Sequence, residues 1–373
     1  MALKIKVGKI GILDVLKFAN QAKTREKIIN ATPEKEISAV FKINENAKQL
    51  HPDYQQCVIY QIIEHKGAQA KTYIFARENG AIPKFRAGQY ISVLLNIDGS
   101  VVTRPYSISS SPEWTHSNKC AITVRKTPNG FASDWILNNW KVGDKVTISG
   151  AEGNFYYDEF RDAKNVIALA GGSGITPFLS MAYAIRDGIE DFNLTIISGS
   201  RTKESILFKD ELDSIERACD KVKIVHVLSE SKAKGFEHGF ITAELIEKYA
   251  PHGEYSIFMC GPEAMYKFEE GEIAKLGLER KFVRRELLGV TKKIWEHEGY
   301  PQECKDKTFK LTVKQGAEEK TIEASANEPL LCAIERNGIA APSRCRSGEC
   351  GWCRSKLVSG TVFVPEENDT GRR

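Results

Sequence analysis

The sequence predicts a multidomain protein with a small antiparallel β-barrel, an α/β domain built on a parallel sheet, and a smaller C-terminal domain. Between Tyr54 and Gly150, short β-rich runs are separated by Gly, Pro and Asn, which is typical of an antiparallel barrel. From Lys164, short apolar runs alternate with helical stretches around 177–187, 207–217, 242–249 and 263–276. That alternation indicates a parallel sheet covered on both faces. The predicted boundaries are 1–53 for a basic helical extension, 54–160 for the barrel, 161–290 for the α/β domain, 291–306 for a linker and 307–373 for the last domain.

The bulk composition predicts a soluble protein of a reducing compartment. Hydrophobic residues make up 42% of the chain and charged residues 27%, which is typical of globular proteins. No apolar run reaches the roughly 18 residues that a membrane span requires, and the basic N-terminus lacks the features of a signal peptide. The nine cysteines therefore favour a cytoplasmic protein, in which clustered thiols are metal ligands before they are disulfides.

The positive charge is concentrated at the N-terminus. Residues 1–50 contain ten Lys or Arg against five Asp or Glu, whereas the whole chain has a net charge of only +4. Residues 9–29 follow a loose helical period. This segment is interpreted either as a docking arm or as a solvated helix packed on the body. No basic stripe with interleaved aromatic residues indicates nucleic-acid binding.

The run RPYSISS (104–110) is the first with recognisable chemistry. On a strand, Arg104 and Tyr106 lie on one face and Ser107 on the other or at the turn. Arginine suits a phosphate and tyrosine suits a flat heterocycle, although the run alone also fits an ordinary strand. The later run AITVRKTPNGFASDWI leads from a strand, through a turn at Gly130, into a helix with Ser133 near its start. Gly130 allows close backbone approach, and the helix N-terminus suits an anion.

Together, R-x-Y-S and the following G-x-x-S resemble the flavin domain of the ferredoxin–NADP⁺ reductase family. The resemblance implies that Tyr106 and Ser107 contact the isoalloxazine ring, while Arg104 and the Gly130–Ser133 turn hold the pyrophosphate. The G-x-x-S form resembles the FAD branch of the family rather than the FMN branch. The strand residues taken as further cofactor contacts are Ile122, Val124 and Arg125.

The parallel sheet carries two nicotinamide motifs of the same family. A glycine-rich turn between a strand and a helix is where such sheets bind a dinucleotide pyrophosphate. The run GGSGITP matches the family's G-G-x-G-x-T-P motif, with Gly171, Gly172, Gly174, Thr176 and Pro177. The run FMCGPEAM matches its C-G-P motif, with Cys260, Gly261 and Pro262. By that resemblance Cys260 borders the path of the hydride; otherwise it is a buried cysteine at the end of a strand.

Two further positions bear on the nicotinamide cofactor. Ser200 and Arg201 follow one strand, and Glu230 occupies the place where relatives specific for NADP carry an arginine. A carboxylate repels a 2′-phosphate and accepts hydrogen bonds from a ribose diol, so NADH is the expected substrate. Glu286 matches a family glutamate near the flavin, but Leu287 replaces the aromatic residue that usually follows. The alternative for Glu286 is a surface ion pair with Arg284 or Arg285.

Three cysteines near the end of the chain, Cys345, Cys350 and Cys353, have the C-x₄-C-x₂-C spacing of a plant-type [2Fe–2S] ferredoxin. The paired knuckles of a zinc site are absent from the sequence. The segment from Lys307 resembles a β-grasp ferredoxin domain, and a cluster needs a fourth thiolate, which no residue after Cys353 supplies. We expect either that the sequence is a shortened form of a longer polypeptide or that the cluster is lost. Substitution by Cys332 or Cys304 requires a changed fold.

In domain order, residues 54–373 resemble reductases that pass electrons from NADH to an oxygenase, a hybrid-cluster protein or a similar redox partner. The resemblance implies an antiparallel β-barrel flavin domain, an α/β parallel-sheet nicotinamide domain and a β-grasp ferredoxin domain that lacks its C-terminal end. It also implies FAD, NADH, a [2Fe–2S] cluster and a protein electron acceptor, with Ser107, Cys260 and Glu286 as catalytic residues. The alternatives are an NADH dehydrogenase that reduces quinones, free flavins or ferric complexes directly from FAD, and an electron-relay subunit of a larger complex.

Overall fold

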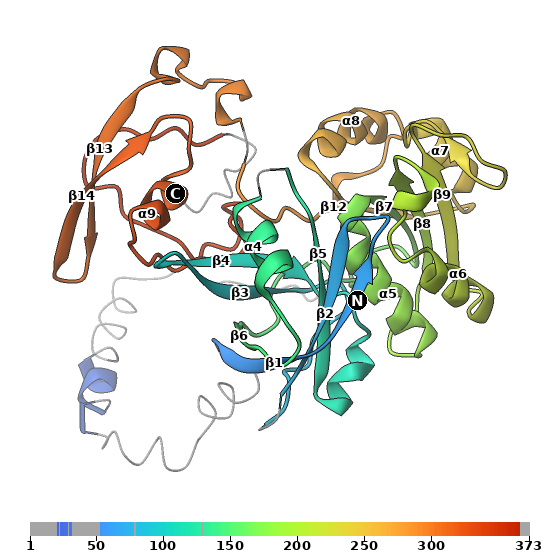
Figure 1. Cartoon of the computed structure of the whole chain (residues 1–373), viewed down its shortest axis with the longest axis horizontal. Coiled ribbons are helices and arrows are strands. Elements are labelled where there is room, and N and C mark those ends of the chain that lie inside the picture. The colour runs from blue at the N-terminus through green and yellow to red at the C-terminus, as the bar shows by residue number, and fades with distance from the viewer. Residues whose placement is uncertain are drawn as a thin grey trace. The chain divides into compact units, whose positions relative to one another are not determined.

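The computed structural model describes residues 21, 23–28, 30–31, 53–77, 80–128, 130–291 and 293–365. The chain divides into two compact units, residues 1–50 and 51–373. In the first unit the described residues are helical, and the rest of the helix expected over 9–29 lies outside the described residues. The second unit contains every strand of Figure 1.

The first sheet of the second unit has six antiparallel strands in the order β4-β3-β6-β1-β2-β5. Their bounds are Gln55–His65 (β1), Ala70–Ala76 (β2), Tyr90–Ile97 (β3), Ser100–Ser107 (β4), Lys119–Arg125 (β5) and Lys145–Ile148 (β6). An antiparallel bridge between Ile108 and Ile122 joins the two ends of this order. Buried Ile, Val and Phe side chains fill its core, and helix α4 (Phe131–Asn139) packs there through Ala132 and Ile136. The predicted barrel is confirmed.

The second sheet has six parallel strands in the order β10-β9-β8-β7-β11-β12. The strands are Asn165–Gly171 (β7), Asn193–Ser200 (β8), Val222–Leu228 (β9), Glu237–His238 (β10), Ser256–Cys260 (β11) and Val283–Arg285 (β12). The helices between them are Thr176–Arg186 (α5), Lys209–Ala218 (α6), Ala243–Tyr249 (α7) and Glu263–Ala274 (α8). The predicted α/β domain with a parallel sheet is confirmed.

Alternate residues of β7 enter two different cores, because successive side chains of a strand point to opposite faces. Val166, Ala168 and Ala170 pack with α5 and α6. Ile167 and Leu169 pack with α7 and α8. The helices therefore cover both faces of the sheet (Figure 1), which leaves the carboxyl ends of the strands as the place for a ligand.

The last part contains a hairpin, Thr308–Gln315 (β13) with Glu318–Ser325 (β14), and helix α9 (Leu330–Arg336). Its core is small, with Ile322, Ala324 and Ala333 buried. The cysteine-bearing residues 340–365 follow without a further helix or strand among the described residues. Short 3₁₀ helices occur at Pro112–Ser117, Gly172–Ile175, Lys203–Ser205, Arg280–Phe282, Ile294–Glu296 and Gln302–Cys304.

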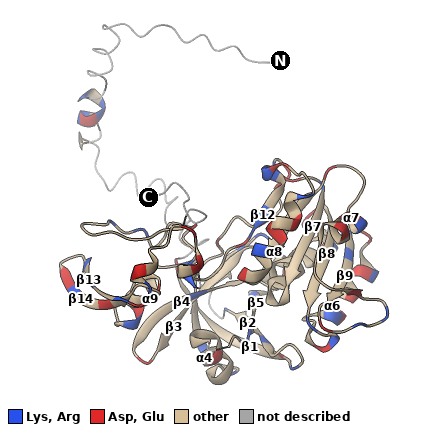
Figure 2. Cartoon of the chain, turned by 90° about the horizontal axis from the view of Figure 1, so that it is seen from above, with Lys and Arg blue, Asp and Glu red and all other residues tan. Residues whose placement is uncertain are grey.

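The surface carries both signs of charge. Figure 2 shows Lys and Arg interspersed with Asp and Glu along the helices that cover the parallel sheet, and α6, KDELDSIERA, carries both signs within ten residues. In the described part of the chain, no helix combines the length and the apolar character needed to cross a membrane.

Candidate active site

Three side chains from separate strand ends meet at one buried point. Ser107 ends β4 of the barrel, Cys260 ends β11 of the parallel sheet, and Glu286 directly follows β12. The Ser107 hydroxyl donates to Glu286 Oε2 at 2.8 Å, and Cys260 Sγ lies 3.8 Å from the same oxygen. All three are buried, and Glu286 is only 6% exposed. The structure thus brings together the three residues expected to be catalytic.

The alternative interpretation of Glu286, a surface ion pair with a neighbouring arginine, is wrong. Arg284 pairs with Asp162 at 2.8 Å, and Arg285 pairs with Glu270 at 2.6 Å. Since both arginines are engaged elsewhere and Glu286 is buried, its carboxyl group is directed to Ser107.

The electrostatics of this site follow from burial. Burial raises the pKa of Glu286 to about 8, with the hydrogen bond from Ser107 opposing the shift. Burial, followed by the nearby Glu286, raises the pKa of Cys260 well above its usual value. Both shifts favour the protonated forms of the carboxyl group and the thiol.

Tyr266 of α8 positions Glu286 and was not identified from the sequence. Its hydroxyl donates to the Glu286 carbonyl oxygen and accepts the Gly261 N–H at 3.1 Å. The Glu286 N–H donates to the Met259 carbonyl at 3.0 Å. The backbone on both sides of the carboxyl group is thus tied to the edge of the parallel sheet. No motif marks Tyr266, because its role depends on a hydrogen bond to a residue twenty positions away.

The turn before α4 is shaped for close approach to an anion. A Cβ atom on Gly130 would lie 2.0 Å from Ser133 Oγ and 2.9 Å from the Thr127 carbonyl oxygen. The helix begins at Phe131 without a side-chain cap, so its first N–H groups keep their capacity for a ligand. These features fit an anion such as the pyrophosphate of FAD, which Gly130 and Ser133 are predicted to bind.

The other expected flavin residues have different surroundings. Tyr106 lies half-buried on β4, whereas the side chains of Ile122 and Val124 are fully buried in the barrel core. Arg104 donates to the Thr103 carbonyl at 2.7 Å and lies 3.8 Å from Glu335 of α9. The guanidinium group expected to hold a phosphate thus also faces the C-terminal part of the chain.

The two glycine turns of the parallel sheet touch one another. A Cβ atom on Gly174 would lie 2.0 Å from the Cys260 carbonyl oxygen, and one on Gly171 would lie 2.3 Å from Met265 Sδ. Gly172 has a φ of +56°, and a Cβ there would lie 2.4 Å from Arg125 Nη1. Only glycine permits this packing, and it brings Arg125 of β5 to the turn expected to hold the pyrophosphate of the nicotinamide cofactor.

The other residues predicted to bind the nicotinamide cofactor lie at the ends of strands and helices. Thr176 and Pro177 open α5, Ser200 ends β8, and Pro262 precedes α8. Arg201 Nε lies 3.6 Å from Glu230 Oε1, and both side chains are exposed. Arg201 is predicted to contact either form of the cofactor, and the carboxylate of Glu230 beside it repels a 2′-phosphate, which fits NADH.

The cysteine loop has the chemistry of an iron–sulfur ligand loop. Cys345 is buried, and the Cys350 N–H donates to its Sγ at 3.4 Å. Hydrogen bonds, first from the Cys350 side chain and then from Ser347, lower the pKa of the Cys345 thiol, whereas the contact with Cys345 raises the pKa of Cys350 and burial raises that of Cys353. Within the described ranges, no three His, Cys, Asp or Glu side chains are grouped closely enough to hold a metal ion. The loop thus carries three thiols in the spacing of cluster ligands, but the described structure does not gather them around one point.

Cys332 faces a different group. Its Sγ accepts from Arg346 Nη2 at 3.6 Å, and Arg346 also forms a buried ion pair with Glu335 at 2.5 Å. Cys332 is therefore engaged with the arginine that follows Cys345.

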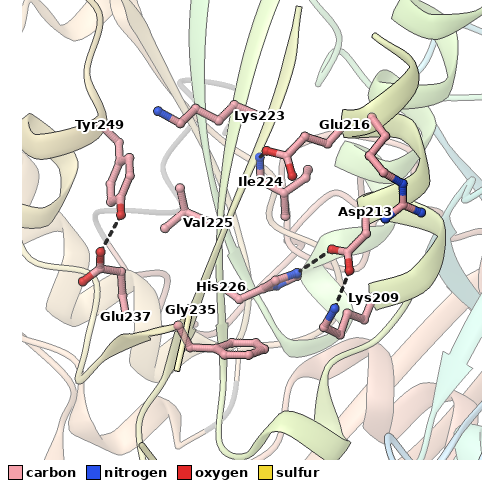
Figure 3. A pocket seen from close by; sticks show the side chains of 12 residues that line it. Lys209, Asp213, Glu216, Lys223, Ile224, Val225, His226, Gly235, Glu237 and Tyr249 are labelled. Carbon is pink, nitrogen blue, oxygen red and sulfur yellow. Dashed lines mark hydrogen bonds and ion pairs between the residues drawn. The ribbon is translucent and has the colours of Figure 1, made fainter. Parts of the chain in front are cut away.

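A separate groove of about 580 Å³ lies along the edge of β9 (Figure 3). Strand β10 is short and pairs with β9 at Val227 and Leu228, the last two residues of β9. The earlier residues of β9 extend beyond this pairing and line the groove. Glu216 of α6 accepts the Ile224 N–H at 2.9 Å, and Asp213 lies between Lys209 and His226. None of the expected site residues lines the groove. Glu216 instead caps a strand edge that would otherwise offer a free N–H to another chain.

Comparisons with known families match all three predicted domains. The oxidoreductase FAD-binding domain matches residues 63–157, the oxidoreductase NAD-binding domain matches 168–270, and the 2Fe-2S iron-sulfur cluster binding domain matches 313–373. These matches support FAD, NADH and a [2Fe–2S] cluster as the cofactors of the chain.

Individual relatives extend over most of the chain. The NADH oxidoreductase HCR of Escherichia coli K12 is 30% identical over 281 residues, which are 75% of this chain and 80% of the relative. The glycine betaine monooxygenase reductase subunit of Chromohalobacter salexigens is 28% identical over 308 residues, 79% of this chain and 83% of the relative. The solved structure of phthalate dioxygenase reductase, described as modular for electron transfer from pyridine nucleotides to [2Fe–2S], is 25% identical with a TM-score of 0.60. It covers 84% of this chain and 92% of that one.

Proposed function

Because this chain belongs to the ferredoxin–NADP⁺ reductase family, in its branch with a C-terminal [2Fe–2S] ferredoxin domain, we propose that it reduces an oxygenase component with electrons from NADH. FAD, when bound, accepts the hydride of NADH, and together with the cluster it divides the electron pair into single-electron steps. The proposal concerns the acceptor and the roles of individual residues.

The hydrogen bond between Ser107 and Glu286 carries the proposal. It joins the end of the flavin barrel to the end of the nicotinamide sheet, with Cys260 beside it. A hydride passes directly only when donor and acceptor lie within contact distance. We assign to Ser107 the role of donating a hydrogen bond to the hydride-accepting nitrogen of the flavin. Glu286 orients that hydroxyl, and Cys260 borders the nicotinamide.

Ser107→Ala tests this assignment. In the FAD-loaded protein mixed with NADH under anaerobic conditions, flavin reduction should slow by about tenfold or more, because a donor to developing charge is lost. FAD content should not change, since the Gly130 turn is intact. Ser117→Ala is the matched control, because this hydroxyl donates only to the Trp114 carbonyl in the same barrel and is exposed. An unchanged rate in Ser107→Ala contradicts the assignment.

The acceptor is tested separately. A Cys350→Ser, Cys353→Ser double variant should still reduce quinones with NADH but should fail to reduce an oxygenase component, because the cluster ligands are lost. Equal reduction of the oxygenase component by the double variant and by the unsubstituted protein would mean that electrons leave directly from FAD.

All nine cysteines are free thiols in the structure, which supports our placing the reaction in the cytoplasm.

A further inference from the structure

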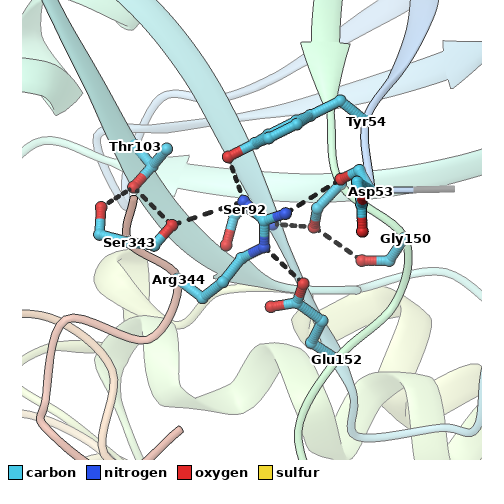
Figure 4. Close-up of polar contacts among 9 residues, drawn as sticks. Asp53, Tyr54, Ser92, Thr103, Gly150, Glu152, Ser343 and Arg344 are labelled. Carbon is cyan, nitrogen blue, oxygen red and sulfur yellow. Dashed lines mark hydrogen bonds and ion pairs between the residues drawn. The ribbon is translucent and has the colours of Figure 1, made fainter. Parts of the chain in front are cut away.

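Arg344, the residue before the first cysteine of the loop, is buried against the flavin barrel. Its side chain is 1% exposed. Its Nε donates to Glu152 Oε1 at 2.6 Å, its Nη2 donates to the Asp53 carbonyl at 3.1 Å, and its Nη1 donates to the Tyr54 hydroxyl (Figure 4). Tyr54 and Glu152 belong to the barrel part of the chain and Asp53 directly precedes it, and all three lie almost two hundred residues or more from Arg344.

Aromatic rings complete the surroundings of this guanidinium group. It lies 4.2 Å from the centre of the Tyr54 ring and 4.4 Å from that of Trp352. A charge removed from water needs such partners, and the loss of one of them strongly destabilises the structure. We call Arg344 with Glu152, Asp53 and Tyr54 the arginine anchor.

The residues on both sides of Arg344 are also attached outside the ferredoxin part. The Thr103 hydroxyl of β4 donates to the Ser343 carbonyl at 3.1 Å. The Gly289 N–H donates to the Cys345 carbonyl at 2.8 Å. Residues 343–345 are thus bonded, one after another, to the barrel and to the segment that leaves the nicotinamide domain.

These attachment points are connected to the hydride-transfer site. Glu152 and Tyr90 exchange backbone hydrogen bonds at 3.0 and 2.8 Å. Tyr90 is paired with Ser107 in the ladder of β3 and β4. Gly289 follows Glu286 by three positions. The arginine anchor therefore fixes the start of the cysteine loop to the same two segments that carry Ser107 and Glu286.

We propose that Arg344 is a positioning residue that holds the cysteine loop against the flavin barrel, and that electron transfer from FAD to the cluster depends on it. The proposal rests on the proposed function, because it concerns the step that follows flavin reduction. The guanidinium group is suited to this role, since its planar fork donates in three directions at once, whereas a lysine ammonium group is a point charge. Lysine at this position should preserve only part of the anchor.

The test uses the full chain with FAD and cluster, mixed with NADH under anaerobic conditions. In Arg344→Ala and in Glu152→Ala, flavin reduction should stay within about twofold of the unsubstituted protein. The later transfer to the cluster should slow at least about tenfold, equivalent to about 1.4 kcal/mol, with Arg344→Lys intermediate. The double variant should be no slower than either single variant, because both remove the same contact. Arg336→Ala is the control, since its exposed pair with Glu328 lies within the ferredoxin part.

Hydrogen exchange gives a readout that does not depend on activity or on the cluster. Backbone amides of residues 53–54 and 343–345 should exchange about tenfold faster in Arg344→Ala, while those of β7 and β11 should not change. The reduction potentials of FAD and cluster should also stay the same, which separates positioning from a general loss of structure.

Two results would overturn the proposal: unchanged transfer to the cluster in Arg344→Ala, or unchanged exchange at these amides. Failure of NADH to reduce the flavin in the unsubstituted protein is a different result, which contradicts the proposed function. In that case, the hydrogen-exchange measurement still shows whether Arg344 holds the start of the cysteine loop to the barrel.

Discussion

The protonation of Glu286 should control how fast NADH reduces the flavin. A hydroxyl group has one proton to donate. When Glu286 is ionised, that proton is held by the 2.8 Å hydrogen bond to its carboxylate. When Glu286 is protonated, the carboxyl group donates to Ser107 instead, and the Ser107 proton is available for the flavin. Since burial raises the pKa of Glu286 to about 8, the change falls within an accessible pH range.

The magnitude follows from the loss of one hydrogen bond. A hydrogen bond of this kind contributes about 0.5–1.5 kcal/mol, and 1.4 kcal/mol corresponds to about a tenfold change in rate. With a pKa of about 8, roughly one tenth of Glu286 is ionised at pH 7 and roughly nine tenths at pH 9. Because about one tenth of Glu286 remains protonated at pH 9 and the ionised form keeps about one tenth of the rate, flavin reduction should slow by about fivefold as the pH rises from 7 to 9.

Stopped-flow measurement of flavin reduction between pH 6.5 and 9.5 tests this reasoning. Glu286→Gln places a permanent donor beside Ser107, so its rate should be high and nearly independent of pH. Glu270→Gln is the control, because this exposed carboxylate pairs with Arg285 and lies outside the site. A rate that is flat or rises through pH 8 in the unsubstituted protein would refute the reasoning, as would an unaltered pH profile in Glu286→Gln.

Three further predictions concern other parts of the chain. Glu269 is buried, its Oε2 has no hydrogen-bond partner among the described residues, and burial raises its pKa to about 8. The folded state therefore keeps a proton on Glu269 at pH values where the unfolded chain has released it. The free energy of unfolding should therefore fall between the ordinary pKa of a glutamate and about pH 8, on the order of 1 kcal/mol per pH unit. Glu269→Gln should reduce this slope in urea unfolding, while the similar contribution of Glu286 remains, and equal slopes would contradict the prediction. Glu216→Ala leaves the Ile224 N–H without its acceptor and should cost about 0.5–1.5 kcal/mol in the same assay; an unchanged unfolding midpoint would argue against that role. Cys353→Ser should lower the iron content per FAD and Cys304→Ser should not, so equal iron in both would exclude Cys353 as a ligand.

The sequence predicted the two sheets and the strand ends of the site because both depend on local patterns. Apolar runs bounded by Gly171 and Cys260 define strand ends, and parallel strands bring such ends to one edge. The ion pair considered for Glu286 failed because Arg284 finds Asp162, a residue 122 positions earlier. Neither Arg344 nor its acceptors form a motif, since the contact joins residues 192 positions apart. Such contacts are set by tertiary packing, on which local periodicity has no bearing.

The departure at Leu287 is explained by how Glu286 is held. In the sequence, leucine in place of an aromatic residue left the role of Glu286 open. In the structure, the Glu286 backbone is fixed by Met259 and Tyr266, and Leu287 packs against the core of the parallel sheet. The carboxyl group therefore reaches Ser107 independently of the size of residue 287. Leu287 lies in a short segment that continues to Gly289, whose N–H binds the carbonyl of Cys345. The same few residues thus position the carboxyl group beside Ser107 and the first thiol of the cysteine loop.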